Sequence, residues 1–266
     1  MIDGPELTAG LRRYIDGDAP IYPTEDRRFV ALHEVLYRLK PDPALLAPLF
    51  GPHPDRDEVD DALQKWDKIS LAVVTSFLRR IVEDPDDPKR AALYDAVAAA
   101  AVPWAFERAW GDSHTLTGEE VGDFFSEAEW PACPEATAAV ARHLEALIER
   151  WRRRVSDKAS SMFFGIVLRH VGAAGAGRLF REWERMHEDE RVDLLKRSIG
   201  VEGLGEEGRR CAVGALLDES QEVREAAVEA LEARGAPLQG LDASSRDEAI
   251  RAALPRLERW AAETES

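Results

Sequence analysis

The chain has 266 residues, 45% hydrophobic and 32% charged, which is enough to bury the core of one large or two small domains. Its formal net charge of −16 repels a polyphosphate backbone, which argues against nucleic-acid binding unless basic residues gather on one face. The two cysteines are far apart and in no metal-ligand spacing, which excludes a disulfide framework and a zinc knuckle. We therefore expect a globular protein whose partner is another protein or a small ligand.

No segment of the sequence is expected to enter a membrane. The N-terminal residues lack the basic start and apolar run of a signal peptide. The longest apolar run, residues 96–106, contains Pro103 and is too short to span a bilayer. We expect the protein in a reducing cytoplasm. Arginine outnumbers lysine by 29 to 6, as in GC-rich bacterial genomes.

The first half predicts helices separated by proline-rich stops. Apolar clusters have helical spacing, and no stretch alternates β-branched and polar residues, so the fold class is expected to be all-α. Helices are expected over residues 24–39, 57–83, 89–110 and 117–128. The second helix should stop before Asp84, and Pro103 should kink or split the third. Residues 130–134, which include two prolines, predict a break between halves.

The second half predicts more regular helices with shorter connections. Apolar helical faces are expected over residues 135–155, 163–170, 179–186, 192–199 and 250–260. Gly172 and Gly200 should each end a helix, and the glycines of residues 172–177 predict a flexible interhelical turn. Ser245 begins a capping-box pattern before the last helix. The total of about ten to twelve helices suits a solenoid of helix pairs or an irregular bundle.

One stretch, CAVGALLDESQEVREAAVEALEARG, predicts two short amphipathic helices joined by a tight acidic turn. Asp218 ends the first helix, and Val223 and Arg224 open the second. Residues 209–235 resemble a HEAT repeat, a helix pair that is stable only when stacked on similar pairs. In that family the aspartate and arginine positions tie the turn to its neighbours, which implies the same structural role for Asp218 and Arg224.

The resemblance implies a right-handed α-α superhelix. HEAT-like repeats are expected over residues 131–266. Residues 1–130 are expected to form a more irregular helical half, with divergent repeats as the alternative. Residues 188–200 can form the second helix of a preceding repeat, because Asp189 and Arg191 stand where a turn aspartate and a helix start belong. There the order Arg-Val reverses the expected Val-Arg.

The sequence contains one cluster of candidate catalytic residues, which lies in a predicted loop and at the start of the helix that follows. It consists of Asp112, His114, Glu119, Glu120 and Asp123. Carboxylates and an imidazole can bind a divalent metal or act as acid and base. The simpler interpretation is ordinary turn and cap residues, with the glutamates favouring the helix dipole. We therefore predict no catalytic residue, no cofactor and no metal.

Two features are candidates for partner contacts. Four arginines form the only concentrated positive patch of the sequence: Arg150, Arg152, Arg153 and Arg154. They can grip a carboxylate or phosphate by bidentate hydrogen bonds, or they can favour the dipole of a helix C-terminus and pair with acidic helices. Trp110 and Trp130 lie near predicted breaks and are candidates for an exposed anchor, although core packing is the simpler interpretation.

These observations predict a non-catalytic protein-binding scaffold or adaptor with an acidic helical surface. Its partner is expected to carry a basic surface, and the association should weaken as salt rises. Nucleic acid and membranes are not expected partners. The alternatives are an enzyme on a HEAT-like scaffold, of the DNA glycosylase or bilin lyase type, or an acidic immunity or inhibitor protein for a basic toxin.

Overall fold

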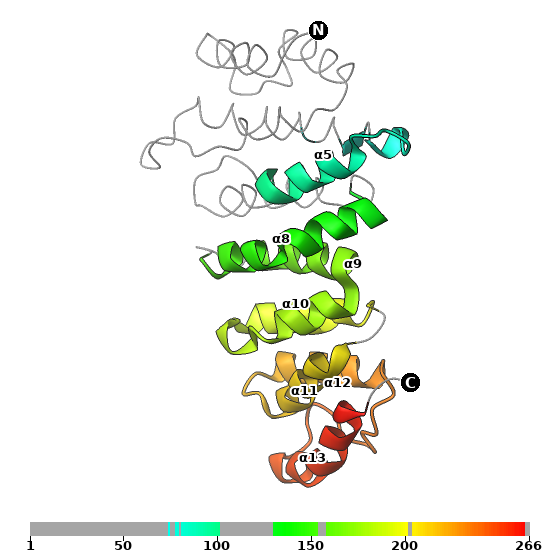
Figure 1. Ribbon diagram of the computed structural model, residues 1–266. Coiled ribbons are helices and arrows are strands. Elements are labelled where there is room, and N and C mark those ends of the chain that lie inside the picture. Colours follow the sequence, from blue (N-terminus) through cyan, green and yellow to red (C-terminus); the bar gives the residue numbers. More distant parts are fainter. Residues whose placement is uncertain are drawn as a thin grey trace, which may run out of the picture. The chain divides into compact units, whose positions relative to one another are not determined.

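The computed structural model describes residues 74, 78–79, 81–101, 130–153, 158–201 and 204–263. These residues are mainly helical and include no strand, which confirms the all-α class for the described part of the chain (Figure 1). The chain divides into two compact units, residues 1–159 and 160–266. The predicted helices over 24–39 and 117–128, and most of 57–83, lie outside the described residues. Within the described ranges, no helix combines the length and apolar character needed to cross a bilayer.

In the first unit, the described helices α5 (Arg90–Ala96) and α8 (Pro134–Arg152) pack against each other. A π-helical turn, η3 (Val97–Ala101), continues α5. An earlier helix ends at residue 83, as predicted from the prolines that follow. Asp95 of α5 forms an ion pair with Arg142 of α8, and its carboxylate lies 3.0 Å from Nε2 of His143 in the same helix. These contacts join the two helices at their polar edge.

The helix predicted over residues 135–155 is confirmed as α8. Its first residue is a proline, which fits there because the first N–H of a helix has no intrahelical acceptor. The buried face has helical spacing and consists of Ala136, Ala139, Val140, Leu147, Ile148 and Trp151. Against it pack Leu93 and Tyr94, the buried residues of α5. This contact is part of the described core of the first unit.

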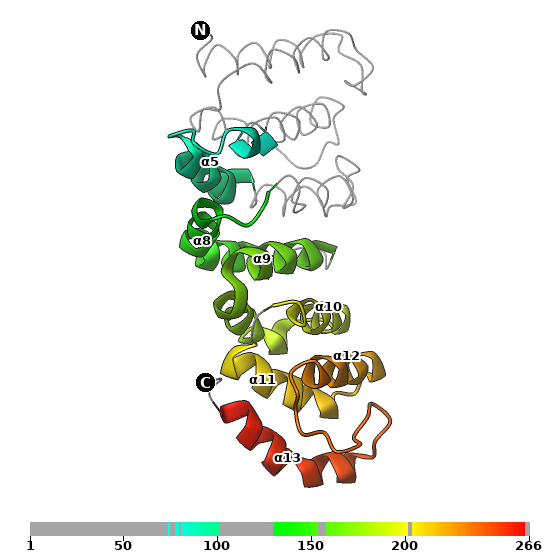
Figure 2. The same ribbon diagram turned by 90° about the vertical axis from the view of Figure 1, so that its right-hand side faces the viewer.

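The second unit contains five helices and two 3₁₀ turns among its described residues. In chain order they are α9 (Lys158–Phe180), η4 (Trp183–Arg185), α10 (Glu188–Ser198), α11 (Gly205–Gly214), η5 (Ala215–Leu217), α12 (Gln221–Glu232) and α13 (Asp247–Ala262). Helix α10 packs on α12, and α11 packs on both α12 and α13. Figure 2 shows these neighbours side by side. Helices α10, α11, α12 and α13 thus pack against helices from other parts of the unit.

Helix α9 is interrupted at Gly172, where φ is 60° and ψ is −138°. The predicted helix end at this glycine is confirmed, because its backbone is not helical. Residues with a side chain rarely adopt this conformation, which explains the glycine. The predicted turn over residues 172–177 is wrong, because the chain is helical again directly after Gly172. Gly175 instead permits close packing: a Cβ there would lie 2.7 Å from Cγ1 of Val167.

The predicted helix pair around Val223 is confirmed as α11, η5 and α12. Ser220 is the N-cap of α12, and its hydroxyl accepts a hydrogen bond from the Val223 N–H at 3.3 Å. The buried face of α12 consists of Val223, Ala226, Ala227, Ala230 and Leu231. Gly235 follows the helix with φ 68°, and the next N–H bonds back to the Leu231 carbonyl at 3.0 Å. Small alanines in this face allow close approach of neighbouring helices.

The predicted capping box at Ser245 is wrong. Helix α13 begins at Asp247, its N-cap is Arg246, and no side chain caps it. The Ser245 hydroxyl is engaged in the preceding turn, where it accepts a hydrogen bond from the Asp242 N–H at 2.9 Å. This local turn competes with the helix for the same side chain.

Candidate functional site

The turn between η5 and α12 is tied to helix α10 through Asp218. One carboxylate oxygen accepts a hydrogen bond from the Ser220 N–H at 3.0 Å, and the other pairs with the Arg191 guanidinium at 2.9 Å. Arg224 donates to the Asp218 carbonyl at 2.8 Å and to the Ala243 carbonyl at 3.1 Å. Asp218 and Arg224 therefore join the turn to α10 on one side and to the segment before α13 on the other.

Arg191 and Arg224 hold equivalent places in the second unit. Each is the fourth residue of its helix, α10 and α12, which pack against each other. Each donates to a carbonyl of the turn before its helix, Trp183 at 3.3 Å for Arg191 and Asp218 at 2.8 Å for Arg224. The same side-chain-to-backbone contact thus recurs at the entry of two neighbouring helices.

Arg209 makes a buried contact with the end of α13. Only 5% of the residue is exposed, and its guanidinium donates to the carbonyls of Ala261 at 3.0 Å and Glu263 at 2.7 Å. Its charged head also lies 5.9 Å from the ring centre of Trp260. The last carbonyls of a helix lack intrahelical donors, so this arginine satisfies α13 from the neighbouring helix α11.

Two further arginines use the same chemistry. Arg234 donates to the carbonyls of Ser198 at 3.0 Å and Ile199 at 3.3 Å, which end helix α10. Arg256 of α13 donates to the Pro237 carbonyl at 2.8 Å. Five arginines of the second unit therefore bind backbone carbonyls that join its segments: Arg191, Arg209, Arg224, Arg234 and Arg256.

The exposed side of α12 is acidic. It carries four exposed glutamates at spacings of three, four and three residues: Glu222, Glu225, Glu229 and Glu232. This spacing puts them on one face of a helix, and we call them the α12 acidic face. Arg224 is the only basic residue of α12, and its guanidinium is bound to backbone carbonyls.

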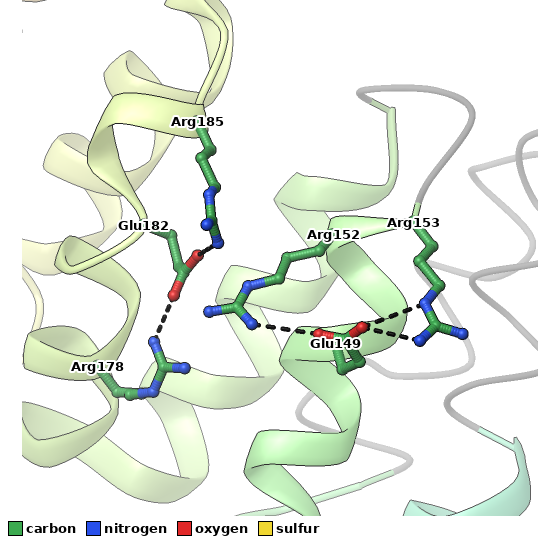
Figure 3. A network of polar contacts seen from close by, with 6 residues as sticks. All are labelled: Glu149, Arg152, Arg153, Arg178, Glu182 and Arg185. Atoms are coloured by element: carbon green, nitrogen blue, oxygen red, sulfur yellow. Dashed lines mark hydrogen bonds and ion pairs between the residues drawn. The ribbon is translucent and has the colours of Figure 1, made fainter.

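The predicted arginine patch lies at the C-terminal end of α8, and Figure 3 shows its pairing. Glu149 binds Arg152 at 3.2 Å and Arg153 at 2.8 Å, and both contacts hold the pKa of its carboxyl below the ordinary value. Arg150 is exposed, and Arg154 lies outside the described residues. The described part of the patch is therefore partly neutralised by a glutamate of the same helix, as expected for a helix C-terminus.

A second carboxylate with two arginines occurs in the other unit. Glu182, 4% exposed, pairs with Arg178 at 2.6 Å and Arg185 at 3.0 Å (Figure 3). Arg178 belongs to the end of α9 and Arg185 to η4, so the carboxylate of Glu182 links these two elements. Since a buried carboxylate requires paired charge, this triad stabilises the turn.

Trp130 is buried and stacks on Tyr94 with ring centres 6.4 Å apart and an interplanar angle of 8°. The hypothesis that it is an exposed anchor is therefore wrong, and core packing accounts for it. Trp110 and the predicted cluster over residues 112–123 lie outside the described residues. Across the described part of the chain, no three His, Cys, Asp or Glu side chains gather closely enough to hold a metal ion.

A thiol site that the sequence reasoning missed lies where α5 meets α8. Cys133 is the N-cap residue of α8 and is half-buried. Interaction with the Cys133 side chain raises the pKa of Arg90, and burial, with Cys133 nearby, raises the pKa of Tyr94. Glu135 lies on the other side of Arg90, 3.6 Å from Nε. The available signal was a cysteine directly before a helix-starting proline, but its neighbours are distant in sequence.

The chain matches no known family, no curated protein and no solved structure. Its function is therefore inferred from the residues and contacts described above.

Proposed function

We propose that the chain is a non-catalytic helical scaffold that binds a protein partner with a basic surface. The observation that carries the proposal is the α12 acidic face. Four exposed carboxylates on one side of a twelve-residue helix create a local negative potential that is stronger than the average acidity of the chain implies. The opposite side of α12 is buried, so the helix is held in place while this face remains open to solvent.

The charge of this face is not cancelled within the described residues. Glu225 accepts a hydrogen bond from the neutral Gln221 side chain at 2.8 Å, and no ion pair joins the four glutamates to a described cation. Lysines and arginines of a partner would supply the missing positive charge. Exposed charges of this kind steer association and set its salt dependence more than they add affinity.

The proposal includes the HEAT-like arrangement. Support comes from the helix pair α11–α12, from the equivalent arginines at the entries of α10 and α12, and from the packing of α10 on α12 and of α11 on α13. Proteins built from stacked helix pairs present extended surfaces made by successive helices. A solenoid would give the α12 acidic face neighbours on the same side of the molecule.

The test is affinity capture from the native host with two charge-reversal variants. Glu225→Lys/Glu229→Lys reverses the centre of the α12 acidic face, and Glu248→Lys/Glu258→Lys makes the same change in net charge at exposed positions of α13. Proteins bound by the wild-type chain are identified by mass spectrometry at low and at physiological salt. We expect a basic protein that the wild type and the α13 variant retain and the α12 variant loses.

Retention by both variants, or by neither, would contradict the proposal, because a specific face must distinguish positions that carry the same charge. Binding that does not change with salt would contradict its electrostatic part. The identity and activity of the captured protein distinguish a general adaptor from an inhibitor of a basic toxin. A toxin would lose its enzymatic activity on binding, whereas the partner of an adaptor would not.

A further inference from the structure

Ser161 lies in the first turn of α9 and contacts an arginine of another helix. The Arg197 guanidinium, in the last turn of α10, donates to the Ser161 hydroxyl at 2.6 Å. Nε of the same guanidinium lies 2.8 Å from each carboxylate oxygen of Asp193, one turn earlier in α10. This pairing orients the guanidinium, and 41% of the Arg197 side chain is exposed. The half-buried Ser161 hydroxyl therefore has an oriented positive charge beside it at the surface.

Four other serines of the described residues donate their hydroxyl to a carboxylate. A phosphoryl group carries a charge of about −1.5 to −2 at pH 7, so at those four positions it would face a like charge. At Ser161 it would face the opposite charge of Arg197. Charge therefore favours Ser161 over these serines as the carrier of a phosphate. The four serines and their partners are Ser160 with Glu190, Ser220 with Glu188, and Ser244 and Ser245 with Asp242.

The surroundings of Ser161 can accept a larger and more negative group. Gly165 lies one turn later on the same side of α9, and a Cβ there would lie 3.4 Å from Nη1 of Arg197. No side chain at position 165 thus stands between this hydroxyl and the second arm of the guanidinium. The first turn of α9 contains no acidic residue, and the backbone N–H groups of a first turn favour negative charge.

We propose that Ser161 is a phosphorylation site and that Arg197 holds its phosphate, which joins α9 more tightly to α10. The phosphoryl donor is ATP, and the catalyst is a protein serine kinase of the host. The Ser161 hydroxyl oxygen attacks the γ-phosphorus of ATP, so that an O–P bond forms and the bond to the β,γ-bridging oxygen breaks. The hydroxyl proton goes to a base of the kinase, and ADP leaves. The phosphate oxygens then accept charge-assisted hydrogen bonds from the Arg197 guanidinium.

The first experiment measures whether Ser161 is modified in the cell. The full chain is isolated from its native host, in growing and in resting cells, and its phosphopeptides are analysed by mass spectrometry. Trypsin cleaves after Lys158 and Arg169, so one peptide contains both Ser160 and Ser161, and fragment ions distinguish them. We expect phosphate on Ser161 and none on Ser160, which is 1% exposed and donates to Glu190. Phosphate on Ser160 instead, or an unmodified peptide in both states, would overturn the proposal.

The second experiment measures what the phosphate does to the fold. Phosphoserine is incorporated at position 161 during translation, and the thermal midpoint is compared with that of the unmodified chain. We expect a rise of about 2 to 4 °C, because the new contacts with Arg197 join two helices. Phosphoserine at position 244 is the control, and it should give no rise because Ser244 donates to Asp242. No rise at position 161, or an equal rise at both positions, would overturn the stabilising role.

Two variants test whether Arg197 holds the phosphate. Arg197→Gln removes the positive charge beside Ser161, and Lys196→Gln removes one from the neighbouring exposed position. We expect the rise caused by phosphoserine at position 161 to disappear in Arg197→Gln and to persist in Lys196→Gln. The rise is measured within each variant, so any change in stability that the substitution itself causes cancels. An undiminished rise in Arg197→Gln would overturn the role of Arg197.

The phosphorylation site does not depend on the proposed binding face. It uses residues of α9 and α10, whereas the α12 acidic face belongs to another helix. Glu225→Lys/Glu229→Lys should therefore lose partner capture and keep the rise caused by phosphoserine at position 161. Failure of either measurement alone shows which of the two proposals is wrong.

Discussion

Burial keeps the imidazole of His170 neutral. The residue is 3% exposed and lies in α9 just before the break at Gly172. Burial and, to a smaller extent, the nearby Arg169 lower its pKa from 6.5 to about 4. Because a buried charge is costly, the folded chain resists protonation of this ring while the unfolded chain does not.

This difference predicts an acid-sensitive contribution to stability. Between pH 6.5 and about 4 the unfolded chain binds a proton that the folded chain refuses, so stability falls as pH falls through that range and levels off below it. His170→Phe should reduce the pH dependence of the free energy of unfolding by about 3 kcal/mol between pH 7 and pH 4. Urea unfolding of both proteins across this range measures it. Parallel stability curves would show that His170 contributes nothing.

At the scale of elements, the interruption of α9 depends on one glycine. Gly172 has φ 60° and ψ −138°, whereas Gly177 lies in the helical part that follows and has open space around its Cβ position. The two glycines are close in the chain and differ only in what their backbone requires. They form a matched pair for substitution.

We expect Gly172→Ala to lower the free energy of unfolding by about 1 to 3 kcal/mol, because an L-residue is strained in that conformation. Gly177→Ala should be neutral or stabilising by up to about 1 kcal/mol, since alanine favours a helix more than glycine does. Chemical denaturation of both variants gives the comparison. Equal destabilisation by both substitutions would show that packing rather than backbone strain controls the site.

Helices were predictable from the sequence where apolar residues at helical spacing were bounded by proline, glycine or turn residues. Helix α8 and the pair α11–α12 agree with their apolar spacing, because the same residues that set the pattern form the core. The details at helix ends were less predictable. Ser245 and the glycines after Gly172 fit more than one local structure, and the choice depends on contacts with Asp242 and Val167 that the sequence does not display.

At the scale of the whole molecule, the chain carries 51 acidic and 35 basic residues. Several of the basic residues are bound to backbone carbonyls in the second unit, so the basic residues relieve less of the acidic excess on the surface than their number implies. Like charges at this density repel each other and oppose the compact state.

Salt should therefore stabilise the fold. Raising ionic strength from about 0.01 M to about 0.15 M shortens the screening length from about 30 Å to about 8 Å. We expect the thermal midpoint to rise by a few degrees, and the rise to be smaller for Glu225→Lys/Glu229→Lys, which has less repulsion to screen. Differential scanning calorimetry measures both. A midpoint that falls with salt would mean that attractive ion pairs outweigh repulsion.

The candidate sites were only partly predictable. The spacing of the α12 acidic face is visible in the sequence. Only the structure shows that the opposite side of α12 is buried and that the Arg224 guanidinium donates to a backbone carbonyl. The surroundings of Cys133 were not predictable, because α5 and α8 are distant in sequence and come together only in the packed fold. Trp130 was ambiguous for a similar reason, since its stacking partner Tyr94 belongs to a distant segment.

The arginine-to-carbonyl joints have a consequence for strongly alkaline solutions. A guanidinium does not release its proton in proteins, and a carbonyl oxygen has none to release. The contacts made by Arg209, Arg234 and Arg256 therefore stay intact at a pH where lysine ammonium groups become neutral. This unit contains no tyrosine, so alkali should loosen it first at its single cysteine and single lysine and last where its helices are joined end to end.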